Sequence, residues 1–262
     1  MLGKLIKYDL KAISPVLLLI HGVLFALTIV VRMALAPHKY FMTDAESVMS
    51  ILLCILRTLS LVGASYATYI FISVRFYKNV YSDEGYLTNT LPVTSGQLLL
   101  SKTISGSIWT FINTAFIFLS LYLVLIQPIF HALTDEEQAF FKFSDSRFAV
   151  LFVFSILLSV VSNVVMFYFS IILGQLFQAH RIIGAIACYF LLNTVVSVLS
   201  VIALILSPFG NELFTPVNDP TALVLLESMS GTFITIDILM VIVTLICYIV
   251  SLHFMKKKRN LI

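Results

Sequence analysis

Long apolar stretches with almost no charged residues recur six times along this chain. A membrane-spanning helix needs about 20 such residues, because the hydrocarbon core of a bilayer is about 30 Å thick. The composition agrees, since 60% of the 262 residues are hydrophobic and only 11% are charged. An ordinary soluble domain is about 25% charged. The sequence therefore predicts an integral membrane protein that crosses the bilayer several times.

The predicted fold is a single all-α transmembrane domain over residues 1–262. The apolar runs are continuous, whereas the strands of a membrane barrel would alternate apolar and polar residues with period two. Reading between the charged residues predicts six spans, at residues 14–36, 47–74, 103–127, 148–174, 182–206 and 232–255.

The basic residues predict that both chain termini lie in the cytoplasm. Lys and Arg accumulate in the cytoplasmic loops of membrane proteins. With six spans and inner termini, eleven of the sixteen basic residues fall inside and four outside, and Arg57 lies within the membrane. The inner ones are Lys4, Lys7, Lys11, Arg75, Lys78, Lys102, Arg181, Lys256, Lys257, Lys258 and Arg259, and the outer ones are Arg32, Lys39, Lys142 and Arg147.

Two segments outside the spans have distinctive patterns. Residues 1–13 place apolar side chains on one helical face and three lysines on the other, which predicts a helix lying in the membrane interface. A plain basic flank is the alternative. The outer loop, residues 207–231, contains three prolines followed by the apolar stretch 222–226. It predicts either a short re-entrant helix before span six or an ordinary structured loop.

The long cytoplasmic loop after span two also has helix signals. Asp83 and Glu84 suit the first turn of a short helix, because carboxylates are stabilised near a helix N-terminus. Pro92 ends that helix, and Thr94 or Ser95 can cap the next one. The pattern predicts a short helix parallel to the membrane, which suits contact with a soluble partner.

This loop, residues 75–102, resembles the signature loop of type-2 ABC exporter permeases. The matching segments are Glu84-Gly85-Tyr86-Leu87, Leu91-Pro92-Val93-Thr94 and Leu98-Leu99-Leu100-Ser101-Lys102. The family also has six spans, an interfacial N-terminal helix, a short second cytoplasmic loop and a re-entrant segment before span six. The resemblance therefore covers nearly the whole chain.

The resemblance implies a coupling helix that docks on a separate ATP-hydrolysing subunit. Two ATPase copies would work with two permease chains, as a homodimer or a heterodimer, in a bacterial plasma membrane. The implied contact residues are Asp83, Glu84, Tyr86, Leu87, Leu91 and Pro92, with local capping or packing as the alternative role. The implied substrate is an amphipathic peptide, toxin, antibiotic or lipid-like molecule.

The chain itself has no G-x-x-x-x-G-K-[ST] phosphate loop, so an enzymatic role is not expected of it. ATP and Mg²⁺ would bind to the partner ATPase, and this chain would hold no cofactor. Its three cysteines form no C-x-x-C pair, which predicts no metal site. Membrane lipid is an expected partner, and nucleic acid is not.

Four polar residues within the predicted spans are candidates for a transport pathway. Arg57 lies ten positions into span two, roughly 15 Å deep, where a charge costs at least a few kcal/mol unless it is paired or hydrated. Asp237 is its candidate partner, and a pathway role and a structural ion pair both remain open. Asn113 and Asn163 can line a polar path or bond to a neighbouring helix.

Two small-residue pairs, Gly22-x-x-x-Ala26 and Gly63-x-x-x-Ala67, predict close helix packing. Two other classes of function remain as alternatives. An ion-coupled secondary transporter would need acidic residues deep in its spans, and Asp237 is the only candidate. An intramembrane enzyme would need a nucleophile, a base and an orienting group, and the sequence offers no such set.

Overall fold

The computed structural model describes residues 2–35, 44–82, 85, 92–126, 146–177, 180–210 and 222–259. The main elements are α1 (Leu2–Leu35), α2 (Asp44–Tyr81), α4 (Ser95–Leu121), the π-helical turn η1 (Tyr122–Ile126), α7 (Ser146–Gly174), α8 (Arg181–Leu206) and α10 (Ala222–Arg259). Within these residues six helices are long and apolar enough to cross a membrane. The prediction of six helical spans in a multi-pass membrane protein is therefore confirmed.

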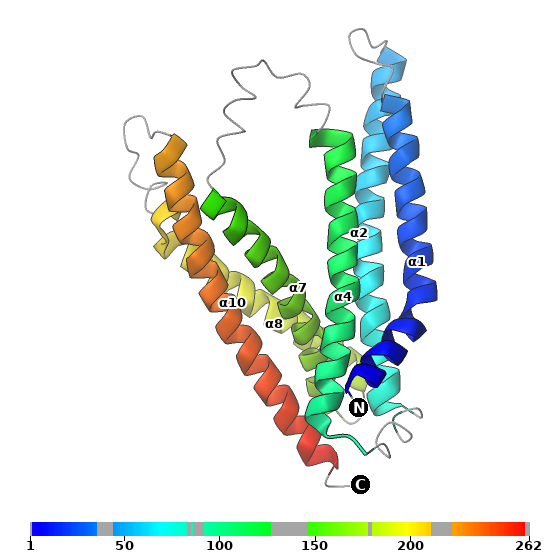
Figure 1. Cartoon of the computed structure of the whole chain (residues 1–262), viewed down its shortest axis with the longest axis vertical. Coiled ribbons are helices and arrows are strands. Elements are labelled where there is room, and N and C mark those ends of the chain that lie inside the picture. Colours follow the sequence, from blue (N-terminus) through cyan, green and yellow to red (C-terminus); the bar gives the residue numbers. More distant parts are fainter. Residues whose placement is uncertain are drawn as a thin grey trace.

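The helices form two groups of three (Figure 1). α1, α2 and α4 stand side by side, and α7, α8 and α10 pack against one another as the second group. The ribbons of the two groups meet at the end of the molecule that carries both termini, here called the base, and diverge toward the other end. The main hydrophobic cluster joins α1, α2, α4, α7 and α10 near the base.

The first turns of α1 lie at an angle to the rest of that helix (Figure 1). Pro15 lies inside the helix and has no N–H to donate to the Lys11 carbonyl, so the helix bends there. The Ser14 hydroxyl donates to that carbonyl at 3.1 Å and satisfies the acceptor that the proline leaves open. In residues 2–13 the lysines are exposed and the apolar face is half-buried, so this segment is the amphipathic start of α1.

α4 begins at a capping box. The Thr94 hydroxyl accepts from the Gln97 backbone N–H at 3.2 Å, and the Gln97 side chain accepts from the Thr94 N–H at 3.3 Å. These two bonds satisfy donors that a helix start would otherwise leave open. Of the two predicted caps, Thr94 is the one used.

Glycines allow close helix approach at other places than predicted. A Cβ atom at Gly22 or Gly63 would meet no neighbouring atom within 4 Å. The prediction of tight packing there is therefore wrong for the described part of this chain. A Cβ at Gly174 would lie 2.6 Å from the Cβ of Ala185, so this glycine allows the tight turn between α7 and α8. At Gly106 a Cβ would lie 2.7 Å from the Tyr168 hydroxyl.

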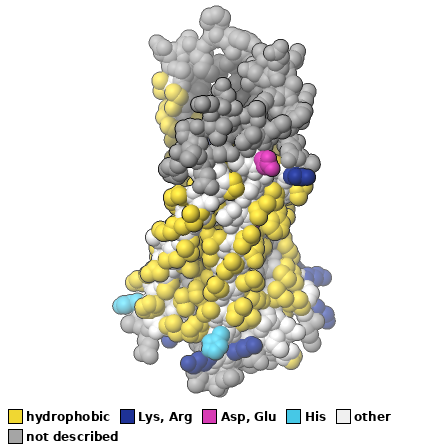
Figure 2. Space-filling model, turned by 90° about the vertical axis from the view of Figure 1, so that its left-hand side faces the viewer, with side chains coloured by type: hydrophobic (Ala, Val, Ile, Leu, Met, Phe, Trp, Pro, Cys, Tyr) yellow, Lys and Arg dark blue, Asp and Glu magenta, His cyan; other side chains and the backbone are white. Residues whose placement is uncertain are grey.

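Residues 222–226, for which the sequence left two readings open, form the first turns of α10 and are continuous with the sixth span. Residues 211–221 of the outer loop lie outside the described part of the chain. Figure 2 shows a wide apolar surface over the spans and a rim of basic and histidine side chains at the base. Exposed residues of these kinds near the base include His180, Arg181, His253, Lys256 and Lys257.

Candidate functional site

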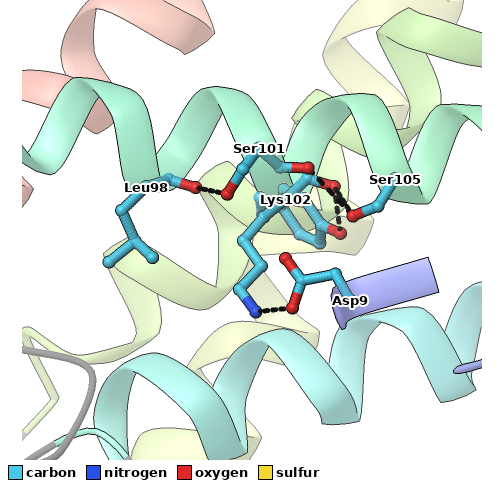
Figure 3. Close-up of polar contacts among 6 residues, drawn as sticks. Asp9, Leu98, Ser101, Lys102 and Ser105 are labelled. Carbon is cyan, nitrogen blue, oxygen red and sulfur yellow. Dashed lines mark hydrogen bonds and ion pairs between the residues drawn. The ribbon is translucent and has the colours of Figure 1, made fainter. Parts of the chain in front are cut away.

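An ion pair at the base joins α1 to α4 (Figure 3). The Lys102 ammonium donates to Oδ1 of Asp9, and the two side chains are only 8% and 12% exposed. The second carboxylate oxygen of Asp9, Oδ2, is buried and has no hydrogen-bond partner among the described residues. Removing one charge of such a pair is strongly destabilising, so the pair fixes the oblique start of α1 against α4.

The backbone around Lys102 is also held by side chains. The Tyr168 hydroxyl, from α7, donates to the Lys102 carbonyl at 3.2 Å. The Ser105 hydroxyl donates to the carbonyls of Ser101 and Lys102, at 2.9 and 3.1 Å, and the Ser101 hydroxyl donates to that of Leu98 at 2.9 Å. The Tyr168 bond ties the first turns of α4 to α7, and the serine bonds lie within α4 itself.

α2 joins the same point through Phe76. Its ring stacks on Tyr168 with 4.1 Å between ring centroids and 14° between planes. Gly106 has no side chain to stand between α4 and the Tyr168 hydroxyl. We call the set of Asp9, Lys102, Tyr168 and Phe76 the anchor, because it joins α1, α2, α4 and α7 within about two turns of the end of α2 and the start of α4.

The predicted coupling residues follow α2 and precede α4. Asp83, Glu84, Tyr86, Leu87 and Leu91 lie outside the described residues. Pro92 is described, in an exposed bend, and it is followed by the buried Val93 and the cap Thr94. The structure therefore describes the two helices that carry the predicted coupling loop and how they are anchored.

A second polar contact joins α1 and α4 farther from the base. Nδ1 of His21 lies 2.6 Å from the Leu17 carbonyl, and Nε2 lies 3.1 Å from Oδ1 of Asn113. Because a carbonyl only accepts, Nδ1 is the donor to Leu17. His21 and Asn113 are each 2% exposed. The Asn113 amide thus bonds to a neighbouring helix.

Arg57 forms a third contact, near the far end of α4. Its Nε donates to the Ser120 hydroxyl at 3.3 Å, and Nη2 donates to the Ser120 carbonyl and hydroxyl at 2.7 and 3.1 Å. The Thr28 and Ser120 hydroxyls are themselves 2.9 Å apart. Arg57 is only 2% exposed. Directly after this contact α4 passes into the π-helical turn η1, and π-helical turns within α-helices are often found at functional sites.

The structure gives Asp237 a different neighbour from Arg57. Asp237, 7% exposed, accepts from the Ser155 hydroxyl of α7 at 2.8 Å. Among the described residues the sequence candidates Arg57 and Asp237 are not paired with each other. Asn163 donates to the Ser159 carbonyl of its own helix at 2.8 Å.

An aromatic stack that the sequence reading did not anticipate connects the two helix groups. Phe167 of α7 lies between Tyr69 of α2 and Tyr189 of α8, with ring centroids 5.1 and 4.2 Å apart and planes within 19° and 15°. Three aromatic residues from three helices carry no sequence signal of their own, because only the packing brings them together.

The anchor was also missed by sequence reasoning, although one signal was present. Asp9 is the only acidic residue in residues 1–43, and it lies among the lysines of an amphipathic segment. Lys102 closes the loop motif. A single acidic residue within a basic segment, here Asp9, is a candidate for an ion pair with a basic residue elsewhere in the chain, here Lys102.

No family model, no curated protein and no solved structure matches this chain. The function is therefore argued from the contacts described above and from the sequence motif.

Proposed function

We propose that this chain is the permease subunit of an ATP-driven exporter, with its base in the cytoplasm. The observation that carries the proposal is the anchor, which joins the end of α2 and the start of α4, the two helix ends that flank the predicted coupling loop. A soluble subunit that pushes on this loop would act on a point where four helices are joined by an ion pair, a hydrogen bond and a ring stack. Packed interiors transmit such displacements, because they have low compressibility.

The surface chemistry supports the same orientation. Exposed lysines of α1 and α10 gather at the base, where they suit the anionic lipids of a cytoplasmic leaflet. In this proposal the oblique start of α1 lies in the interface, and residues 83–91 include the coupling helix. Two ATPase subunits and a second permease chain complete the transporter in a bacterial plasma membrane.

The pathway is proposed to lie where the two helix groups diverge. The stack of Tyr69, Phe167 and Tyr189 joins the two groups, and the buried polar contacts of Arg57 and Asn113 lie within the first group, between α2 and α4 and between α1 and α4. An amphipathic substrate such as a peptide, an antibiotic or a lipid-like molecule suits such a mixture, because its polar and apolar parts both find partners.

Co-purification with a cognate ATPase tests the proposal. The tagged chain is expressed together with the ATPase genes of its source, and the ATPase is expected to co-purify. Glu84→Lys and Leu87→Asp are expected to reduce the recovered ATPase at least about tenfold, since a buried docking residue contributes about 1.4 kcal/mol or more. Glu136→Lys, a matched charge reversal in the outer loop, should leave recovery unchanged. Recovery of no ATPase, or equal recovery from all variants, contradicts the proposal.

The burial of Asp237 favours a second candidate, an ion-coupled carrier. This carboxylate has a serine hydroxyl as its described partner, and buried acids in membrane spans often exchange protons or bind cations. Uptake into vesicles that contain the chain distinguishes the two. Transport driven by a proton or sodium gradient without ATP, and abolished in Asp237→Asn, supports the carrier. Transport that needs the ATPase and ATP supports the exporter.

A further inference from the structure

Arg57 carries a charge that no described residue compensates. Its side chain is 2% exposed, and its Nε and Nη2 atoms donate only to the hydroxyl and carbonyl of Ser120, which are neutral. Nη1, the third guanidinium nitrogen, has no hydrogen-bond partner among the described residues. An arginine within a membrane usually pairs with an anion or faces water, because an unpaired buried charge is costly. The free end of this guanidinium therefore suits an anionic ligand.

The charge lies close to one membrane surface, at the end of the molecule opposite the base. Arg57 is six residues inside the apolar span that begins at Ile51, and Ser120 is four residues inside the span that ends at Val124. At about 1.5 Å per residue, these positions are about 9 and 6 Å from the span ends. The head-group region follows directly on the hydrocarbon core. The guanidinium therefore lies where a lipid phosphate can approach it.

A groove on the outward face of α2 adjoins this charge. Its volume is about 450 Å³. In the described part of the chain it is lined by Ile51, Cys54, Ile55, Thr58 and Leu59. Ile51, Ile55 and Leu59 are 60%, 50% and 63% exposed, so in a membrane the groove faces lipid. Cys54 precedes Arg57 by three residues, and residues at this spacing are neighbours on a helix surface.

We propose that this groove and Arg57 form a binding site for one anionic phospholipid, with an acyl chain in the groove and the phosphate on the guanidinium. The planar fork of arginine matches phosphate oxygens and can bond to two of them at once. A bilayer lipid fits better than a soluble anion, because the groove is mostly apolar and opens toward hydrocarbon. The proposal requires only a membrane-spanning chain and stands whether or not an ATPase partner exists.

Protection of Cys54 reports directly on the groove, because this thiol lines it and is partly exposed. In the full chain with Cys188→Ala and Cys247→Ala, alkylation by N-ethylmaleimide is timed in mixed micelles of an uncharged detergent and one lipid. Phosphatidylglycerol is expected to slow the reaction at a concentration at least about tenfold lower than phosphatidylcholine with the same acyl chains, since only the first has a net negative charge. Equal protection by the two lipids overturns the proposal. Equal protection by oleate or by inorganic phosphate also overturns it.

Arg57→Met tests the role of the charge. Phosphatidylglycerol is expected to protect Cys54 in this variant only at a concentration at least about tenfold higher, because the charge-assisted bonds are lost. The matched control is Arg32→Met, which removes an arginine from the last turn of α1 and should leave the protection unchanged. Unchanged protection in Arg57→Met overturns the proposal. Should Arg57→Met fail to fold, the comparison of lipids on the unaltered site decides alone.

Ile55→Trp tests the groove while Arg57 stays in place. A bound lipid raises the unfolding temperature of the protein in detergent, and the lysines at the base contribute equally to this rise in every variant. Ile55→Trp fills space that the acyl chain would occupy, so we expect about tenfold weaker binding of phosphatidylglycerol. Ile70→Trp makes the same change farther along α2, at a residue that is 57% exposed, and should keep the full rise. Equal rises in the two variants overturn the proposal.

Discussion

Asp9 shows at the residue scale how one charge can decide where two helices meet. Asp9→Asn removes the carboxylate from Lys102 at a site where both side chains are mostly buried. We expect the folded state to lose about 3–5 kcal/mol, the cost of leaving a buried charge uncompensated. Thermal unfolding of the purified protein in detergent measures the loss. Lys7→Ala, an exposed lysine of the same helix, is the control and should change little.

The double variant Asp9→Asn with Lys102→Gln is expected to recover most of that stability, because neither side chain then carries a charge. A double-mutant cycle isolates the coupling between the two residues. Equal and additive losses in the single and double variants would contradict a direct pair.

Arg57 makes a different prediction, because it is buried without a carboxylate among the described residues. Arg57→Met keeps a long apolar side chain and leaves the Thr28–Ser120 hydrogen bond in place. We expect stability to stay within about 1 kcal/mol of the original or to rise, since replacing a buried charge by an apolar side chain is often neutral or stabilising. Transport should fall at least about tenfold if the guanidinium serves the pathway, as measured in reconstituted vesicles. Loss of stability with unchanged specific transport would mark Arg57 as structural.

At the scale of elements, α4 depends on its capping box at the end of the predicted coupling loop. Thr94→Ala removes the hydroxyl that accepts from the Gln97 N–H, while the backbone N–H of residue 94 can still donate to the Gln97 side chain. We expect a loss of about 1 kcal/mol and faster amide hydrogen exchange confined to the first turn of α4. Thr94→Ser keeps the hydroxyl and serves as the control. Unchanged exchange in Thr94→Ala would show that the loop, rather than the cap, fixes this helix start.

Helix contacts give a paired prediction at glycines. Gly174→Ala places a Cβ 2.6 Å from that of Ala185, and we expect a loss of about 1–3 kcal/mol from overpacking. Gly63→Ala adds its methyl group in open space and should stabilise α2 by up to about 1 kcal/mol, because alanine is the better helix former. Thermal unfolding of both variants measures the contrast, and equal effects would contradict the described packing.

At the scale of the whole molecule, the sequence was sufficient for the helices and insufficient for their contacts. Apolar content and charge predicted the six spans, and the sequence left Thr94 and Ser95 open as caps, of which the structure uses Thr94. The helices run past the apolar stretches because flanking charged residues are themselves good helix formers, so α1 begins at Leu2 and α2 ends at Tyr81. The positions of Arg57 and Asp237 along the spans suggested that they form an ion pair. The packing of α2 on α4 instead places Ser120 against the guanidinium, and nothing in the sequence distinguishes that serine from the others.

The two helix groups share a construction that only the contacts reveal. In the first group, α1 and α4 run parallel and meet through His21–Asn113 and Thr28–Ser120, seven residues farther along each helix. In the second, α7 and α10 meet through Ser155–Asp237 and Ser162–Thr244, again seven residues apart. A spacing of seven returns to the same helix face, so each group is held by one polar seam. Two such units joined mainly at the base can change their relative tilt without breaking either seam.

An ATPase can drive a change in the relative tilt of the two helix groups only if the base of the molecule faces the cytoplasm. Glu227 and Lys256 are exposed near opposite ends of α10. In a cysteine-free background we expect an impermeant maleimide to label Glu227→Cys in intact cells, and Lys256→Cys only after permeabilisation, because basic segments are retained in the cytoplasm. The reverse pattern would place the loop between α2 and α4 outside the cell. No ATPase could then reach it, so that single result would exclude the exporter.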